Sequence, residues 1–323
     1  MSEWLVERGI GETRAALVAG GRIVKARIER DGDGPRVGAI MAARLVERLG
    51  PALARTALDQ GGEAMLDRPP PVLTLGARLR VETTREAIPE RVRPKLAKAV
   101  LAAEGALPGP GPSLIDRITA TALPVRYPPA HGPDLLEAAG WSEVIAEALT
   151  GEIAFPGGAL RLFVTPAMTL FDVDGAPPLG PLARAAAGAV GAAIVRHGVG
   201  GSIGVDFPTL ANKDERLAAA HTLDLALPQP FERTAINGFG FLQIVRRRSR
   251  TSLPELIQGD PVAVETLALL RSLERTPPPL SADQPVPPRI AKRLAREPGW
   301  VAEARRRTGV ALAFRPTAPQ LRG

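Results

Sequence analysis

The sequence contains no cysteine and only three histidines. The lack of cysteine excludes disulfide bonds, thiolate zinc sites and cysteine nucleophiles. The histidines, His131, His197 and His221, have no spacing typical of a metal site. We therefore expect them to be structural or surface residues, and we expect no zinc in the protein.

Long apolar segments are also missing. The longest uninterrupted run of apolar residues and glycine, 185–195, is too short to span a bilayer. The N-terminus lacks the basic segment followed by an apolar one that marks a signal peptide. These two absences predict a soluble, cytoplasmic protein that does not contact membranes.

Basic residues are abundant instead. The 323 residues carry a formal net charge of +7, with a pI near 10.6, and 45% of them are hydrophobic. The length allows two or three domains with a large core. The excess of arginine predicts a polyanionic partner, nucleic acid before membrane, because no basic amphipathic helix stands out. A genome that favours arginine codons is the alternative explanation.

The hydrophobic pattern divides the first half of the chain. Alternation over 13–19 and 22–30, joined by Gly20-Gly21, predicts a hairpin. Short strands separated by turn residues over 36–88 predict a small barrel, followed by a basic, helical pattern over 91–104. A linker rich in proline and glycine at 107–112 leads to a further helical pattern over 133–151.

The second half alternates between strand and helix. We predict strands at 159–164, 168–173, 202–207 and 239–245, and helices at 182–196 and 212–227. A strand, crossover helix and strand in succession are typical of a layered α/β domain. The C-terminal part is predicted to hold a helix at 260–276, a basic helix at 289–309 and a final strand at 310–316.

Three aspartates follow apolar strands of this α/β pattern. Asp172 and Asp174 lie in "TLFDVDG", and Asp206 lies in "GSIGVDF". Because a single helix links the two strands, Asp172 and Asp206 should lie at the carboxyl ends of neighbouring parallel strands. Carboxylates that converge repel each other unless a cation binds them, and oxygen ligands select Mg²⁺ or Mn²⁺. The alternative is that these aspartates only make turns.

Other motifs compete for the same segments. "TLFDVDG" also looks like the first motif of haloacid-dehalogenase-type phosphotransferases, with Asp172 as nucleophile and Asp174 as acid. Ala176 replaces the usual threonine of that motif, and no convincing lysine motif follows. "GGSIG" resembles a nucleophile elbow in its letters but precedes its strand, so it is rejected. The basic run "VRRRSR" is a solvated charge cluster unless it lies beside a metal site, where arginine suits phosphate oxygens.

Residues 163–253 resemble the catalytic core of the ribonuclease E/G family. The matching segments are "TPAMTLFDVDG", "GVGGSIGVDF" and "INGFGFLQIVRRR", in that order. The resemblance implies a metal held by Asp172 and Asp206 with Asp174 beside them. It also implies RNA-binding cations, at Lys213, Arg246 and Arg248.

The resemblance extends over nearly the whole chain and implies a multidomain α/β (α+β) fold. The expected parts are an N-terminal hairpin packing on the core (1–35), a degenerate OB-type RNA-binding barrel (36–104), a linker and helix in place of a sensor or ribonuclease H-like region (105–155), a layered DNase I-like catalytic domain (156–253) and a small C-terminal α/β domain (254–323).

The departures from the family pattern are equally specific. Asp174 replaces an amide and adds negative charge at the metal, while Pro166 and Gly238 replace a glutamate and an arginine. Ala57 and Met65 occupy the barrel positions of two aromatic residues, so stacking worth about 1–3 kcal/mol per base is lost. "ELIQGD" replaces the cysteine zinc link, and we expect no pocket for an RNA 5′-monophosphate.

Together these features predict a Mg²⁺-dependent endoribonuclease that cleaves single-stranded RNA in RNA processing or decay, with Mn²⁺ as a substitute metal. Two alternatives stay open: an RNA-binding relative with little or no catalysis, and a haloacid-dehalogenase-type phosphatase. Without a zinc link, a homodimer would have to form through the catalytic domain.

Overall fold

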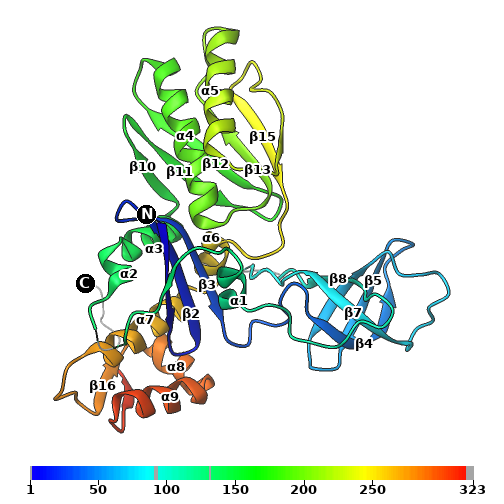
Figure 1. Cartoon of the computed structure of the whole chain (residues 1–323), viewed down its shortest axis with the longest axis vertical. Helices are drawn as coiled ribbons and strands as arrows, with labels where there is room; N and C mark the ends of the chain where they lie inside the picture. Colours follow the sequence, from blue (N-terminus) through cyan, green and yellow to red (C-terminus); the bar gives the residue numbers. More distant parts are fainter. Residues whose placement is uncertain (1, 91–93, 131, 318–323) are drawn as a thin grey trace.

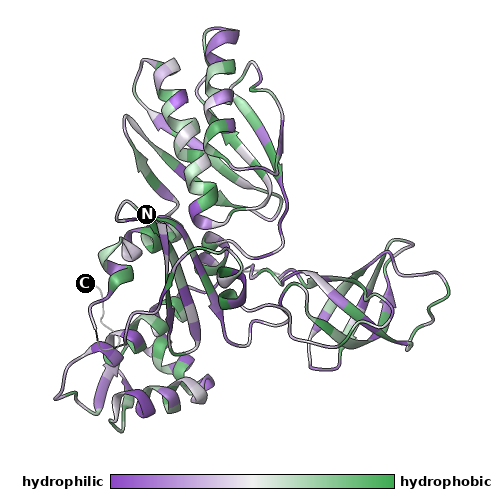
Figure 2. Cartoon of the chain, viewed as in Figure 1, coloured by the Kyte–Doolittle hydropathy of each residue, from purple (hydrophilic) through white to green (hydrophobic). Residues whose placement is uncertain are grey.

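The computed structural model describes residues 2–90, 94–130 and 132–317. It is a mixed α/β structure with an N-terminal sheet, a closed barrel, a helix-covered sheet and a helical C-terminal part (Figure 1). Buried hydrophobic residues form one core between the larger sheet and its helices and another in the barrel. Figure 2 shows hydrophobic and hydrophilic residues interspersed along the helices and strands. The predicted combination of a barrel with α/β layers is confirmed at this level.

The N-terminal sheet is an antiparallel meander. It consists of β1 (Ser2–Arg8), β2 (Glu12–Ala19) and β3 (Arg22–Arg30), with β9 (Val125–Arg126) parallel to β1. Gly20 and Gly21 have φ angles of 58° and 75°, which a tight hairpin turn between β2 and β3 requires. The predicted hairpin is confirmed, and β1 adds a strand that the sequence pattern did not indicate.

The barrel closes in the order β4-β5-β6-β8-β7. Its strands are β4 (Ile40–Arg48), β5 (Leu53–Leu58), β6 (Glu63–Asp67), β7 (Arg78–Arg85) and β8 (Ala97–Leu101). Alternate residues such as Ala54, Thr56 and Leu58 are buried, so the barrel has a core of its own. The small barrel predicted from short, punctuated strands is confirmed.

Strand β8 corrects the helical prediction for 91–104. Ala97 and Ala99 are buried while Lys98 between them is exposed, which is the period of a strand. Pairing with β6 and β7 closes the barrel and outweighs the helical propensity of an alanine-rich segment. The start of the predicted segment, 91–93, lies outside the described residues.

Short helices connect the barrel to the second half of the chain. They are α1 (Leu114–Thr119), α2 (Leu135–Ala138) and α3 (Trp141–Thr150). The helix predicted over 133–151 is divided between α2 and α3, because Gly140 takes a left-handed conformation with φ 97°. Trp141 and Val144 of α3 pack against the N-terminal sheet and against α6 (Leu253–Gly259).

A larger sheet forms the layered part of the chain, in the order β10-β11-β12-β13-β15-β14. Its strands are β10 (Glu152–Phe155), β11 (Gly158–Val164), β12 (Thr169–Gly175), β13 (Gly201–Asp206), β14 (Glu232–Arg233) and β15 (Phe241–Arg246). Strands β12 and β13 run parallel, whereas β11 and β15 are antiparallel to their neighbours.

Two helices cover one face of this sheet, as Figure 1 shows: α4 (Leu179–His197), the crossover between β12 and β13, and α5 (Lys213–Ala226). They pack closely because α4 is rich in small residues. A Cβ atom on Gly191 would approach the Cβ of Ala226 to 2.7 Å, so this position requires glycine. Both helices were predicted within a few residues of these bounds.

The C-terminal part is helical with a small parallel sheet. It contains α7 (Pro261–Arg275), α8 (Pro288–Arg296), α9 (Pro298–Thr308), β16 (Asp283–Val286) and β17 (Ala313–Pro316). The single basic helix predicted over 289–309 is wrong, because it is divided at Glu297. Pro298 lacks the amide hydrogen that would continue α8, and it suits the first turn of α9.

A buried ionic cluster joins the N-terminal sheet to α7. We define it by its members: Glu7, Glu12, Arg14, Asp134, Arg271 and Arg275. The Arg14 side chain is 1% exposed, and its Nη2 lies 2.8 Å from carboxylate oxygens of both Glu7 and Asp134. Burial alone would lower the pKa of Arg14, but these two carboxylates raise it above its ordinary value.

Replacing Arg14 tests how strongly this cluster holds the parts together. Arg14→Met should destabilise the protein by about 3–5 kcal/mol, because Glu7 and Asp134 would remain buried without their main cation. Urea denaturation followed by circular dichroism measures this. The control is Arg306→Met, which removes an exposed pair with Glu303 and should leave the free energy of unfolding nearly unchanged. Equal losses of stability in both variants would show that the buried ionic cluster does not hold the N-terminal sheet against α7.

Candidate functional site

Asp172 and Asp206, the carboxylate pair, lie side by side at one edge of the larger sheet. They are register partners on the parallel strands β12 and β13. Neighbouring strands are about 4.8 Å apart, so the two side chains start from adjacent backbone positions. The predicted neighbouring parallel strands are confirmed, but only Asp206 ends its strand, because hydrogen bonding to β11 extends β12 past Asp172 to Gly175.

Strand periodicity decides which way these side chains point. Phe171, Val173 and Val205 are buried in the core shared with α4 and α5. Residues between them on the strands face the opposite side, which no helix covers, so Asp172 is partly exposed and Asp206 is exposed. The sheet therefore presents the carboxylate pair on its open face.

Within the part of the chain that the structure describes, no side chain or amide donates a hydrogen bond to either member of the carboxylate pair. Arg161 of β11 is the register partner of Asp172, but its Nε lies 2.7 Å from Oδ2 of Asp174. Asp174 is therefore paired, and the negative charge expected from it at the metal is offset. The pairing of β11 with β12 brings Arg161 diagonally within reach of Asp174, which the local sequence around Asp174 does not reveal.

The donor set of the carboxylate pair fits a hard divalent cation. Mg²⁺ is commonly bound by one or two carboxylates and keeps several of its waters, so two adjacent unpaired aspartates provide a suitable site. A cluster of three or more histidine, aspartate or glutamate side chains arranged for a metal does not occur among the described residues. Asp174 could become a third ligand only by leaving Arg161.

Lys213 lies at the same edge of the sheet. It begins α5 directly after the loop that follows β13, and its side chain is exposed. Asn212 caps the helix by accepting a hydrogen bond from the Glu215 amide at 2.9 Å. Asp214 and Glu215 in the first turn weaken the attraction of this helix end for anions, so Lys213 is the group there suited to a phosphate.

An exposed aromatic residue, which sequence reasoning missed, adjoins the carboxylate pair. The turn before β15 places Phe241 opposite Asp206 in register, and the Asn237 side chain accepts hydrogen bonds from the Phe239 and Phe241 amides. Phe239 is 86% exposed at the tip of this turn. A strand pattern alone favours burial of such a phenylalanine, and only the turn geometry reveals its exposure.

Arg246 and Arg248 lie at the opposite end of the sheet from the carboxylate pair. Because β15 is antiparallel to β13, Arg246 pairs with Gly201 while Phe241 pairs with Asp206. Five residues of extended strand span about 17 Å, so neither arginine is near the metal position. Arg248 forms an ion pair with the buried Glu255. These two arginines therefore lie away from the carboxylate pair, and their role in binding RNA stays a prediction.

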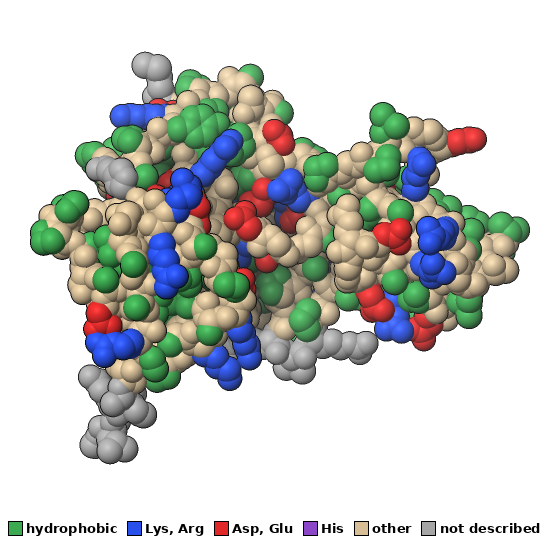
Figure 3. Space-filling model, turned by 90° about the horizontal axis from the view of Figure 1, so that it is seen from below, with side chains coloured by type: hydrophobic (Ala, Val, Ile, Leu, Met, Phe, Trp, Pro, Cys, Tyr) green, Lys and Arg blue, Asp and Glu red, His purple; other side chains and the backbone are tan. Residues whose placement is uncertain are grey.

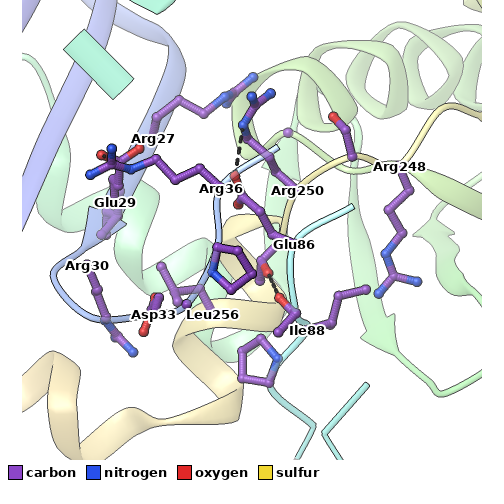
Figure 4. A pocket seen from close by; sticks show the side chains of 18 of the residues that line it. Arg27, Glu29, Arg30, Asp33, Arg36, Glu86, Ile88, Arg248, Arg250 and Leu256 are labelled. Carbon is purple, nitrogen blue, oxygen red and sulfur yellow. Dashed lines mark hydrogen bonds and ion pairs between the residues drawn. The ribbon is translucent and has the colours of Figure 1, made fainter. Parts of the chain in front are cut away.

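A basic cavity of about 860 Å³ lies at that opposite end (Figure 4). Its walls come from β3, the barrel, the end of α4, the segment after β15 and α6. Figure 3 shows acidic and basic side chains around the hollow between the barrel and the main body. The described lining residues include eight arginines against four carboxylates, namely Arg27, Arg30, Arg36, Arg117, Arg246, Arg247, Arg248 and Arg250 against Glu29, Asp33, Glu86 and Asp260.

The sequence also singled out the histidines and two residues of the barrel. His197 is buried, its Nε2 lies 2.9 Å from Glu147, and burial lowers its pKa, so its structural interpretation is confirmed. His221 is exposed, and His131 lies outside the described residues. On the barrel, Ala57 and Met65 alternate with buried neighbours and face outward.

No protein-family model matches the chain, and no curated protein matches it. No helix among the described residues is long and apolar enough to cross a membrane. The resemblance to ribonuclease E/G therefore stays a prediction.

Metal binding can be measured without any activity. Mn²⁺ titration followed by electron paramagnetic resonance should show a site that Asp172→Asn or Asp206→Asn weakens about tenfold or more, because each removes a charged ligand. Asp174→Asn should bind nearly as well as the wild type, since Asp174 is held by Arg161. An equal loss in all three variants would instead make Asp174 a ligand.

Proposed function

We propose that this protein is a metal-dependent endoribonuclease that cleaves single-stranded RNA. The observation that carries the proposal is the carboxylate pair, two unpaired aspartates in register on parallel strands, exposed at one edge of the sheet. Such an edge is where open α/β sheets place ligands and reacting groups.

The roles follow from the positions. Asp172 and Asp206 would hold Mg²⁺ through their carboxylate oxygens. When bound, the ion lowers the pKa of a coordinated water and offsets charge on a phosphodiester. Lys213 at the same edge suits a neighbouring phosphate, and Phe239 offers a face on which an unpaired base can stack.

Three wider features support RNA as the substrate. The chain carries a net charge of +7, it contains a closed five-stranded barrel within the described residues, and a cavity lined by arginines lies beside that barrel. The finer assignments belong to the same proposal: an OB-type barrel, a DNase I-like catalytic layer, a cytoplasmic location and any homodimer through the catalytic domain.

The phosphatase alternative is disfavoured by the sheet. Within the described part of the larger sheet, β12 and β13 are the only parallel neighbours, whereas a haloacid-dehalogenase-type domain is built on a parallel sheet. In addition, Asp174, the expected general acid, lies within β12 and is paired with Arg161.

An RNA-binding relative with little catalysis is the second candidate. It is favoured by the distance of about 17 Å between the carboxylate pair and Arg246, which leaves few cations beside a scissile phosphate. The outward-facing Ala57 and Met65, where stacking aromatics were expected, point the same way.

Cleavage of a 5′-labelled single-stranded RNA in Mg²⁺ tests the proposal. Asp172→Asn and Asp206→Asn should each reduce the rate by about a hundredfold or more, because each loses several kcal/mol of charge stabilisation. Both should keep the wild-type melting temperature and RNA affinity. Wild-type activity in either variant would show that the site is misassigned, and a wild type that binds RNA without cutting it would favour the second candidate.

Asp174 separates nuclease from phosphatase chemistry. Asp174→Asn should keep or improve RNA cleavage, since an amide adds no charge beside the carboxylate pair and the exposed pair with Arg161 is worth at most about 1 kcal/mol. The phosphatase hypothesis requires the opposite, because there Asp174 is the essential acid. Rates of this variant on RNA and on a small phosphate ester decide between them.

A further inference from the structure

The basic cavity contains cations that no carboxylate neutralises. Glu29 is shared by Arg36 and Arg117, at 3.3 and 3.2 Å, and Glu86 lies 3.3 Å from Arg250. Arg27 and Arg246, by contrast, contact no carboxylate among the described residues.

Arg27 is fixed in place through backbone contacts alone. Its guanidinium donates hydrogen bonds to the carbonyls of Arg196 and Val195 at the end of α4, at 3.0 and 3.3 Å. It also packs against Gly198, where a Cβ atom would approach the guanidinium carbon to 3.1 Å. The partial negative charge of a helix end offsets a cation only in part. Arg27 is therefore held rigidly at the cavity wall with its charge largely uncompensated.

Neighbouring cations confirm that this end of the cavity is electropositive. Burial, together with the charges of Arg246, Arg117 and Arg250, lowers the pKa of Arg27 to about 10. The pKa of Lys25 is also lowered, mainly by burial and to a smaller extent by the charges of Arg27 and Arg246. In Figure 4 the Arg27 side chain extends toward Arg250. An anion between these side chains would relieve their repulsion, and the planar guanidinium fork matches phosphate oxygens.

The barrel forms one wall of the same cavity, through Met41, Leu58 and Gly61. A strand of nucleic acid lying on the barrel would therefore pass directly by the arginines. The cations of the cavity continue along the segment after β15 as Arg247 and Arg250, while Arg248 is paired with Glu255. A row of cations suits successive phosphates of a backbone better than a single terminal group.

We propose that the basic cavity binds an internal phosphate of single-stranded RNA through Arg27, Arg246 and Arg250. This rests on the proposed RNA substrate but not on catalysis. The phosphate bound there would lie at the opposite end of the sheet from the carboxylate pair, so one RNA would have to extend over several nucleotides to occupy both.

Fluorescence anisotropy with a fluorescein-labelled, 5′-hydroxyl oligouridylate in EDTA tests the proposal without cleavage. Arg246→Gln and Arg27→Gln should each raise the Kd for the oligouridylate about tenfold, because each variant loses one charge-assisted contact to phosphate. Each should also reduce the slope of log K against log salt by about one. The matched control is Arg22→Gln, an exposed arginine on the same strand as Arg27 but outside the cavity, which should change neither.

Melting curves of each variant guard against loss of the fold. If Arg27→Gln unfolds because the end of α4 loses its contacts with Arg27, the Kd and salt slope of Arg246→Gln decide whether the cavity binds RNA. A folded Arg246→Gln variant with wild-type Kd and slope overturns the proposal, as does a wild type that does not bind the probe. A probe that binds only when it carries a 5′-phosphate would also overturn it, in favour of a terminal phosphate. Absence of Mg²⁺-dependent cleavage in a wild type that binds would instead refute only the nuclease function.

Discussion

The parallel pairing of β12 with β13 is the constraint on which the candidate site depends. A parallel neighbour requires a crossover, and α4 provides it with a surface of small residues that lets α5 pack closely beside it. This pairing sets Asp172, within β12, opposite Asp206 at the end of β13. With any other partner for β13, the two carboxylates would belong to separate surfaces.

The same topology separates charge along the sheet. Strand β15 runs antiparallel to β13. Its first residue, Phe241, therefore lies beside Asp206, and its last residue, Arg246, lies at the opposite end of the sheet. The result is an acidic edge suited to a metal and a basic cavity suited to phosphate. A polyanion that extends along the molecule can contact both, whereas a small phosphate ester can occupy only one.

The basic cavity exists because several parts of the chain meet there. The hairpin contributes Arg27, the barrel contributes an apolar wall, and the segment after β15 contributes the other arginines. The buried ionic cluster around Arg14 holds the N-terminal sheet against α7 and so fixes one side of this meeting point. Three arginines and three carboxylates balance in that cluster, whereas arginines outnumber carboxylates in the basic cavity.

The sequence by itself determined the local elements, because alternation and turn residues act over a few positions: the hairpin, the barrel strands, the crossover unit and the placement of Asp172 and Asp206 on neighbouring parallel strands. Tertiary structure decided the rest. Barrel closure made a strand of 97–101 against its helical propensity. The pairing of β11 with β12 brought Arg161 diagonally to Asp174, and the antiparallel return of β15 placed Arg246 far from the carboxylate pair. Each of these depends on contacts between residues distant in sequence, which no local pattern encodes.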